Sequence, residues 1–275
     1  MKKINLLYLA MAFTLLLGAC KKSDTEPAAD PNTQGTLEVE FENFVGSQSL
    51  SFDTTGTTYT NTATGEQFSV TMLNYYISNI SLKTADGRTY VVPQDSSYFL
   101  VKHENPETMK FKINVPEGDY TEMTFMIGVD SARNANSSLP RTGVLDPATG
   151  AAGMYWQWKS GYIFFKMEGK SPQSADAAKK FRYHIGLYGG GEGETSEVLK
   201  LNCIRTKTLS FGTEKAIVRK SKMPTVHILT DVFKVFNGST SLKIAEKNTV
   251  MVNSFAPNIA NNYVDMFTFD HLHND

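Results

Sequence analysis

Apolar and polar side chains alternate along much of the chain after residue 35. Leu37, Val39 and Phe41 alternate with three glutamates, and this period of two predicts a half-buried strand. Similar patterns predict further strands at Gln67–Leu73, Ile77–Thr84, Thr89–Val92, Met109–Val115, Glu122–Val129, Tyr162–Glu168, Arg182–Leu187, Glu197–Ile204 and Thr225–Leu229. Turn-forming sequences separate these strands, among them the glycine run 189–193, which is expected to be a mobile hairpin tip. The pattern favours an all-β fold, a single antiparallel β-sandwich with long loops and sparse helix.

Helical and irregular segments are few in this pattern. Short helices are expected at Ser174–Lys180 and at Asp231–Val235, where Asp231 lies near the N-terminus of the second. Residues 130–161 contain few recognisable strands, and a long loop in a compact domain is usually functional or disordered. This segment ends in the aromatic run Met154-Tyr155-Trp156-Gln157-Trp158, which favours a functional loop.

The first 35 residues have a different texture. Lys2 and Lys3 precede an apolar run over residues 4–17, followed by Gly18, Ala19 and Cys20. This arrangement is typical of a secretory signal peptide, and a cysteine at that position resembles the bacterial lipoprotein signal. An ordinary signal peptide or a poor membrane helix is the alternative, although the run is short for a spanning helix. We expect a signal peptide at 1–19, lipidation of Cys20 and a flexible polar linker through residue 35.

Composition and charge exclude several classes of protein. Without residues 1–19 the chain carries 25 basic and 28 acidic side chains, a formal charge of −3 that gives no footprint for nucleic acid. Cys203 is then the remaining cysteine besides Cys20, so no intramolecular disulfide is expected within the domain. Its place in a predicted strand favours a buried structural thiol over a metal ligand. Gly-x-Ser-x-Gly, His-Glu-x-x-His and the Walker loop are absent from the sequence, which leaves a hydrolase without a motif.

Histidines are the candidate metal ligands. His271 and His273 stand two apart at the end of the chain, and in an extended strand they face the same side and could hold one ion. Two solvated histidines on a frayed tail are the alternative, but the apolar segment 263–269 is expected to pin the tail to the body. His184 lies in a predicted strand, where a lone histidine is usually a structural or surface group.

The two tryptophans, Trp156 and Trp158, are also two residues apart and would share a face of an extended segment. Anchoring of the long loop is the simpler role for such large rings. The alternative is a stacking platform for a sugar or another planar ligand, formed with Tyr155 and Tyr162.

Five stretches of this sequence together resemble the MbnP-like family, which is named for a periplasmic partner of methanobactin copper uptake. The resemblance covers about residues 35–273, and the Trp-x-Trp-x-x-Gly-Tyr sequence is its most specific part. The lipoprotein signal with a short polar linker is similar to that of members from the Bacteroidota. The five stretches are Leu73–Ile80, Ile127–Asp130, Met154–Tyr162, Phe181–Gly186 and Asp270–His273.

This resemblance implies a copper site built from histidines in a domain spanning 36–275. By position His184 is its best single ligand, and His271 and His273 match the ending of the lipoprotein branch. In some members a tryptophan near the copper is oxidised to kynurenine, which places Trp156 or Trp158 beside the expected site. The paired cysteines of some members and a second histidine beside the tryptophans are missing here.

From the sequence and the resemblance we expect extracytoplasmic copper binding or trafficking, without catalysis. The protein would be lipid-anchored on the periplasmic or cell-surface face of the outer membrane. Its expected partners are the membrane, through the lipid anchor, and either a haem-containing maturation protein or a metal-uptake receptor. The alternative function is a surface lipoprotein that binds glycan or protein through its aromatic residues.

Overall fold

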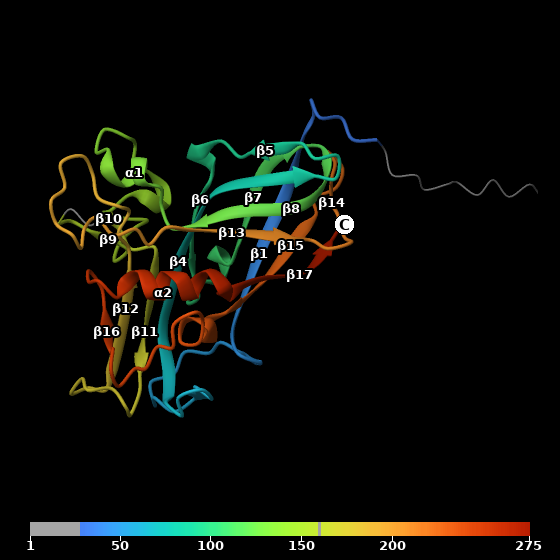
Figure 1. Cartoon of the computed structure of the whole chain (residues 1–275). Helices are drawn as coiled ribbons and strands as arrows, with labels where there is room; N and C mark the ends of the chain where they lie inside the picture. The colour runs from blue at the N-terminus through green and yellow to red at the C-terminus, as the bar shows by residue number, and fades with distance from the viewer. Residues whose placement is uncertain (1–27, 159–160) are drawn as a thin grey trace, which may run out of the picture.

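The computed structural model describes residues 28–158 and 161–275 (Figure 1). The predicted signal peptide, the predicted lipidation site Cys20 and the part of the predicted linker before residue 28 lie outside these residues. The strands are β1 Gln34–Val45, β2 Gln48–Ser49, β3 Tyr59–Thr60, β4 Gln67–Thr84, β5 Thr89–Val91, β6 Tyr98–Lys102, β7 Lys110–Pro116, β8 Gly118–Ile127, β9 Tyr155–Trp156, β10 Gly161–Tyr162, β11 Phe165–Lys170, β12 Lys180–Ile185, β13 Arg205–Ser210, β14 Ala216–Val218, β15 Thr225–Asp231, β16 Thr249–Val250 and β17 Phe267–His273. The helices are α1 Ser131–Ala135 and α2 Ala256–Tyr263, with 3₁₀ turns at Gln94–Ser96, Pro106–Thr108, Gly143–Leu145, Val232–Val235 and Val264–Met266.

Two sheets form the body of the domain. The smaller has the order β17-β15-β1-β2, with β7 also paired to β1. The larger has the order β13-β8-β4-β11-β12-β16, and shorter strands pair with β4 and β8. The predicted all-β fold with sparse helix is confirmed, but the sheets are mixed rather than antiparallel: β15 runs parallel to β1, and β16 parallel to β12. Parallel pairing requires a long crossover, and most of the chain separates β1 from β15.

An aromatic core joins the two sheets. Phe41 from β1 and Phe267 from β17 are buried against Tyr75 of β4 and Phe125 of β8, with ring centroids 5.4–6.3 Å apart across the sheets. Edge-to-face geometry of this kind adds to the burial of large apolar surface. Because Phe267 begins β17, this core fixes the position of the last strand, as the apolar segment 263–269 predicted.

The long β4 replaces two predicted strands. Residues 67–73 and 77–84 belong to one strand of 18 residues, which runs through the middle of the larger sheet. Its register against β8 shifts between Ser78 and Ser81, where Asn79 has a φ of 51°. A bulge at this point bends the strand without ending it, and it lies within the second predicted segment rather than in the gap at residues 74–76 between the two.

Two sequence predictions of local structure were wrong. The predicted strand Glu197–Ile204 is a series of turns, and the strand of this region is β13, directly after it. Leu199, Leu201 and Cys203 alternate with polar residues as in a strand, but the backbone turns at residues 197–200, so these side chains cover the core from a loop. The predicted helix Ser174–Lys180 is also made of turns, because Asp176 accepts hydrogen bonds from the backbone of Ala178 and Lys180.

The predictions for Asp231–Val235 and for Cys203 were confirmed. A 3₁₀ turn follows Asp231, whose carboxylate accepts a hydrogen bond from the backbone N–H of Phe233 at 3.0 Å. Cys203 is a fully buried free thiol, and burial raises its pKa to about 12. The glycine run 189–193 opens a long loop after β12 that closes with a single bridge between Tyr188 and Asn202.

The two ends of the described chain lie close to each other at one end of the domain (Figure 1). There the backbone N–H of Asp30 donates to the carboxylate of Glu117 at 3.0 Å, so the chain is in contact with the body four residues before β1 begins. Among the described residues no helix is both long and apolar enough to span a membrane.

Candidate metal centre

The pairing of β15 with β17 brings three histidines together. His227 at the middle of β15 lies directly opposite His271 in the ladder. The register then shifts, because Ile228 pairs with Phe269 and Asp270 is left without an opposite residue. Such a bulge changes the direction of a side chain, and here Asp270 reaches both His227 and His271. The bulge therefore adds a carboxylate to a face that already carries imidazoles.

His271 stands at the centre of this His–Asp cluster, which we define as His227, Asp270, His271 and His273. Its Nδ1 lies 2.7 Å from Asp270 Oδ2, and its Nε2 lies 2.9 Å from Nε2 of His273. Its ring stacks on that of His227 at 4.7 Å between centroids, and His227 Nδ1 is 3.3 Å from the same Asp270 oxygen. Ligand atoms of His227, Asp270 and His271 all lie within 4.8 Å of one another.

The contacts of the His–Asp cluster suit a metal ion. Asp270 can accept the Nδ1 proton of His271, which fixes the tautomer that leaves Nε2 free to bind a metal. The 2.9 Å between the Nε2 atoms of His271 and His273 is close to the separation of two nitrogens that are each about 2 Å from one ion. A second carboxylate, that of Glu42, lies 3.9 Å from His227 Nε2. Two neighbouring carboxylates favour a cation at this surface.

Exposure differs among the members of this cluster. The His227 side chain is only 14% exposed, whereas those of Asp270 and His271 are 39% and 41% exposed. One donor is therefore held in place by the sheet and the others face solvent. An ion bound here could therefore pass to another molecule without local unfolding of the domain.

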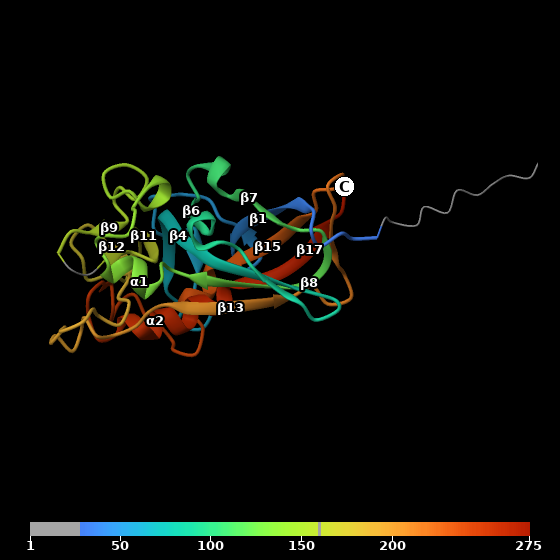
Figure 2. The same cartoon turned by 90° about the horizontal axis from the view of Figure 1, so that it is seen from above.

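His184 does not join the other two predicted ligands. It lies on the outer side of β12, where its Nε2 is 2.7 Å from Glu168 Oε1 on the neighbouring β11. Lys166 Nζ is 3.8 Å from the same oxygen, and burial lowers the pKa of His184. β12 and β17 are at opposite ends of the domain in both views (Figures 1 and 2). The three predicted ligands therefore occupy two places, because the predicted strands carried no information on which sheet each joins.

His227 and Asp270 are the members of the cluster that sequence reasoning did not select as ligands, and His227 is the histidine among them. It occupies the middle of the strand predicted at Thr225–Leu229, on its half-buried face. A pairing of this strand with the tail would have identified it, but a sequence pattern alone does not supply strand order.

The tryptophans lie at the β12 end, Trp156 in β9 and Trp158 in the connection between β9 and β10. Trp156 is 8% exposed, and its ring covers Gly186 so closely that a Cβ there would lie 2.7 Å from Cζ3. Trp158 is 59% exposed, with its ring 5.8 Å from that of Trp156. Tyr162 is fully buried. The two tryptophans thus do not share an open face, and the aromatic platform expected as an alternative is reduced to Trp158 and the half-buried Tyr155.

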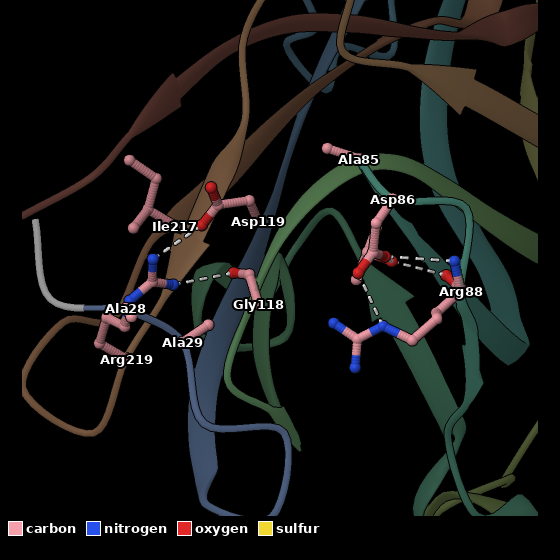
Figure 3. A pocket seen from close by; sticks show the side chains of 10 residues that line it. Ala28, Ala29, Ala85, Asp86, Arg88, Gly118, Asp119, Ile217 and Arg219 are labelled. Carbon is pink, nitrogen blue, oxygen red and sulfur yellow. Dashed lines mark hydrogen bonds and ion pairs between the residues drawn. The ribbon is translucent and has the colours of Figure 1, made fainter.

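His103 and a cavity beside the first described residues are accounted for by contacts within the protein. His103 packs edge-on against Phe52 with its Nδ1 3.3 Å from the side-chain amide nitrogen of Asn43. A cavity of about 400 Å³ lies beside the first described residues (Figure 3). Its charges are paired within the protein, Arg219 with Asp119 at 2.8 Å and Arg88 with Asp86 at 2.9 Å. We assign no ligand to this cavity.

Comparisons with known proteins agree with the fold and the sequence resemblance. None of the curated proteins matches the chain. The solved structure of MbnP from Methylosinus trichosporium is similar with a TM-score of 0.52 and 15% identity, over 81% of this chain and 82% of that one. At this identity the likeness shows the fold alone. The sequence model of the MbnP family matches residues 34–253, which include His184 and His227 and end before the C-terminal pair. The chain belongs to the MbnP family.

Proposed function

We propose that this protein binds copper at the His–Asp cluster and holds or transfers it outside the cytoplasm, without catalysis. The observation that carries the proposal is the convergence of His227, Asp270 and His271 on one side of the β15–β17 pair, with His273 in contact with His271. Family membership supports copper in particular, because the MbnP family is linked to copper.

Donor chemistry also favours copper. Imidazole is a good ligand for copper, and among divalent first-row ions Cu²⁺ binds a given set of nitrogen and oxygen donors most tightly. Two to three histidines are also enough to hold Cu(I). The half-exposed side chain of His271 suits a protein that delivers its ion, since a partner can reach it.

The same proposal includes attachment to the membrane through Cys20. The described chain begins at the end of the domain that carries the C-terminus and the cluster (Figure 1). A lipid on Cys20 would then place the copper site on the side of the domain that faces the outer membrane. A metal-uptake receptor or a haem-containing maturation protein remains the proposed partner.

Calorimetric titration of copper into the chain lacking residues 1–20 tests the site. We expect one ion per chain, and loss of that binding in the double variant His271→Ala, His273→Ala. The matched control is His184→Ala, which removes an imidazole with an equally close carboxylate partner and should leave the stoichiometry unchanged. Binding well below one ion per chain, or binding that survives in the double variant, would reject the site.

A second experiment separates the cluster from a site at the β12 end. Electron paramagnetic resonance of the Cu²⁺-loaded protein should show several equivalent nitrogen couplings that change when His227 is replaced by Gln. If the spectrum responds to His184→Gln instead, the copper belongs beside the tryptophans and the proposed site is wrong.

A further inference from the structure

A cleft of about 420 Å³ lies at the end of the domain opposite the His–Asp cluster (Figure 1). The segment after α1, the β9–β10 hairpin and the glycine-rich loop after β12 form its walls. Its lining includes Asn134, Arg141, Tyr155, Tyr188, Glu192 and Glu194. The volume is within the range of small-molecule sites in proteins.

Arg141 is fixed between aromatic rings. Its Cζ lies 5.1 Å from the ring centroid of Tyr155 and 5.8 Å from that of Tyr162. Nη1 donates to the Tyr155 hydroxyl at 2.7 Å and Nη2 to the carbonyl of Asn134 at 3.2 Å. A planar guanidinium stacked and bonded in this way is pre-organised, so little side-chain entropy remains to be lost when it binds an anion.

The charge of Arg141 has no carboxylate partner in the part of the chain that the structure describes. Its Nε is buried and makes no hydrogen bond to any described residue. Nη1 and Nη2 each make one hydrogen bond within the protein and each carry a second N–H, so a carboxylate can accept two parallel hydrogen bonds from this end of the guanidinium. This arginine therefore favours a ligand with a carboxylate group.

A negative charge faces the same cleft. Glu194 lies on the glycine-rich loop, and its Oε1 accepts a hydrogen bond from the backbone N–H of Ser196 at 2.8 Å, which holds the carboxylate in place. Glu194 and Arg141 line the same cleft, yet no ion pair joins them within the described residues. Glu192 adds a further negative charge at the rim. The cleft therefore offers one fixed cation and one fixed anion at separate places.

We propose that this cleft binds a free α-amino acid. Its carboxylate pairs with Arg141, its ammonium group pairs with Glu194, and its side chain lies against Tyr155 and Tyr188. The two glutamates would repel a ligand that carries only a negative charge, and Arg141 would repel one that carries only a positive charge. A zwitterion therefore matches the charges of the cleft better than either. The two tyrosine rings favour an apolar or aromatic side chain. The proposal is independent of the copper site.

Calorimetric titration with L-phenylalanine, its methyl ester and its N-acetyl derivative tests this proposal on the metal-free chain lacking residues 1–20. The free amino acid should bind, and each derivative, which lacks one of the two charges, should bind at least about tenfold more weakly. Equal binding of all three compounds would overturn the proposal, as would the absence of binding by L-phenylalanine at millimolar concentration.

Two variants assign the two charges. Arg141→Gln should weaken L-phenylalanine at least about tenfold and remove the preference over the methyl ester, and Glu194→Gln should remove the preference over the N-acetyl derivative. The matched control is Arg88→Gln, which changes an exposed arginine in another cavity and should alter none of these affinities. A circular dichroism spectrum and a Tm close to those of the parent show that each variant is folded. If Arg141→Gln does not fold, Arg141→Lys keeps the charge without the planar fork and should still lose affinity, and full affinity in that variant would overturn the proposal.

Discussion

The β12 end and the β17 end of this domain each carry a histidine paired with a carboxylate, and they differ in the other groups around that pair. His184 at the β12 end and His271 at the β17 end each have a carboxylate oxygen at 2.7 Å. Beyond that contact, His271 meets the rings of His227 and His273, whereas the carboxylate beside His184 also has the ammonium group of Lys166 at 3.8 Å. A carboxylate partner alone therefore does not identify a metal ligand. Converging imidazoles favour a metal ion more strongly, and a neighbouring cation counts against one.

The largest expected effect comes from removing the core residue that anchors β17. Phe267→Ala deletes a fully buried ring that packs on Phe41, Tyr75 and Phe125, and should cost about 3–5 kcal/mol of unfolding free energy. The His–Asp cluster should be disturbed together with β17, while the β12 end keeps its structure. Urea denaturation followed by tryptophan fluorescence measures the loss.

The control for this prediction lies two residues further along the same strand. Phe269 is only half-buried and packs on Phe211 with ring centroids 5.0 Å apart. Phe269→Ala should cost clearly less than Phe267→Ala. Equal losses in the two variants would show that the core does not fix β17 as described.

The next effect concerns the two carboxylates. Asp270→Asn keeps the shape of the side chain but removes the charge that orients His271, and should weaken copper by about 10–100-fold. Glu168→Gln makes the same change beside His184 and should leave the copper affinity unaltered. Competition with a chromophoric chelator measures both. A reversed order of effects would move the metal to the β12 end.

Much of the fold was predictable because alternation survives in single strands. β1, β7, β12 and β15 match their predicted segments closely, since each has one face on the core and one toward solvent. α2 was not predicted, because its asparagine-rich sequence has little apolar character beyond Ile259, Ala260 and Tyr263. Parallel pairing was not predictable either, since it depends on which distant strand becomes the neighbour.

The site was predictable only in part, for a related reason. The spacing of His271 and His273 indicates a shared side of one strand, and the structure places their Nε2 atoms 2.9 Å apart. His227 enters through the ladder between β15 and β17, and Asp270 through a bulge in it. Neither register nor bulges can be read from composition or spacing. The resemblance added His184, which geometry places at the other end of the domain.

The thermal stability of the protein should depend on pH through His184 at the β12 end. Burial lowers the pKa of His184 below the ordinary 6.5, although Glu168 opposes the shift. Between the two values the unfolded chain binds a proton that the folded chain does not, so stability is full above pH 6.5 and falls as the pH is lowered toward the folded-state pKa. His184→Gln should reduce this acid-induced fall in Tm, measured by differential scanning calorimetry at constant ionic strength.

His103 should contribute to the same fall in Tm at low pH. Burial lowers its pKa in the same direction, so the variant of His184 should remove only part of the dependence. Adding His103→Gln should flatten the curve further. A Tm profile of the His184→Gln protein that coincides with that of the parent would contradict the assignment of this pH dependence to the β12 end.

The smallest effect on stability is expected at Trp158. Its ring is 59% exposed, so Trp158→Phe should change the unfolding free energy by no more than about 0.5 kcal/mol. The same variant should remove most of the tryptophan emission that iodide can quench, because Trp156 is only 8% exposed and covers Gly186. Trp156→Phe is the matched variant: it should retain the quenchable emission and lose stability through the gap left over Gly186.

Oxidants that attack indole rings should likewise modify Trp158 first, which peptide mapping by mass spectrometry would show. Preferential modification of Trp156 would mean that the β9–β10 hairpin opens in solution, and the difference between the two rings would then be one of dynamics rather than of packing.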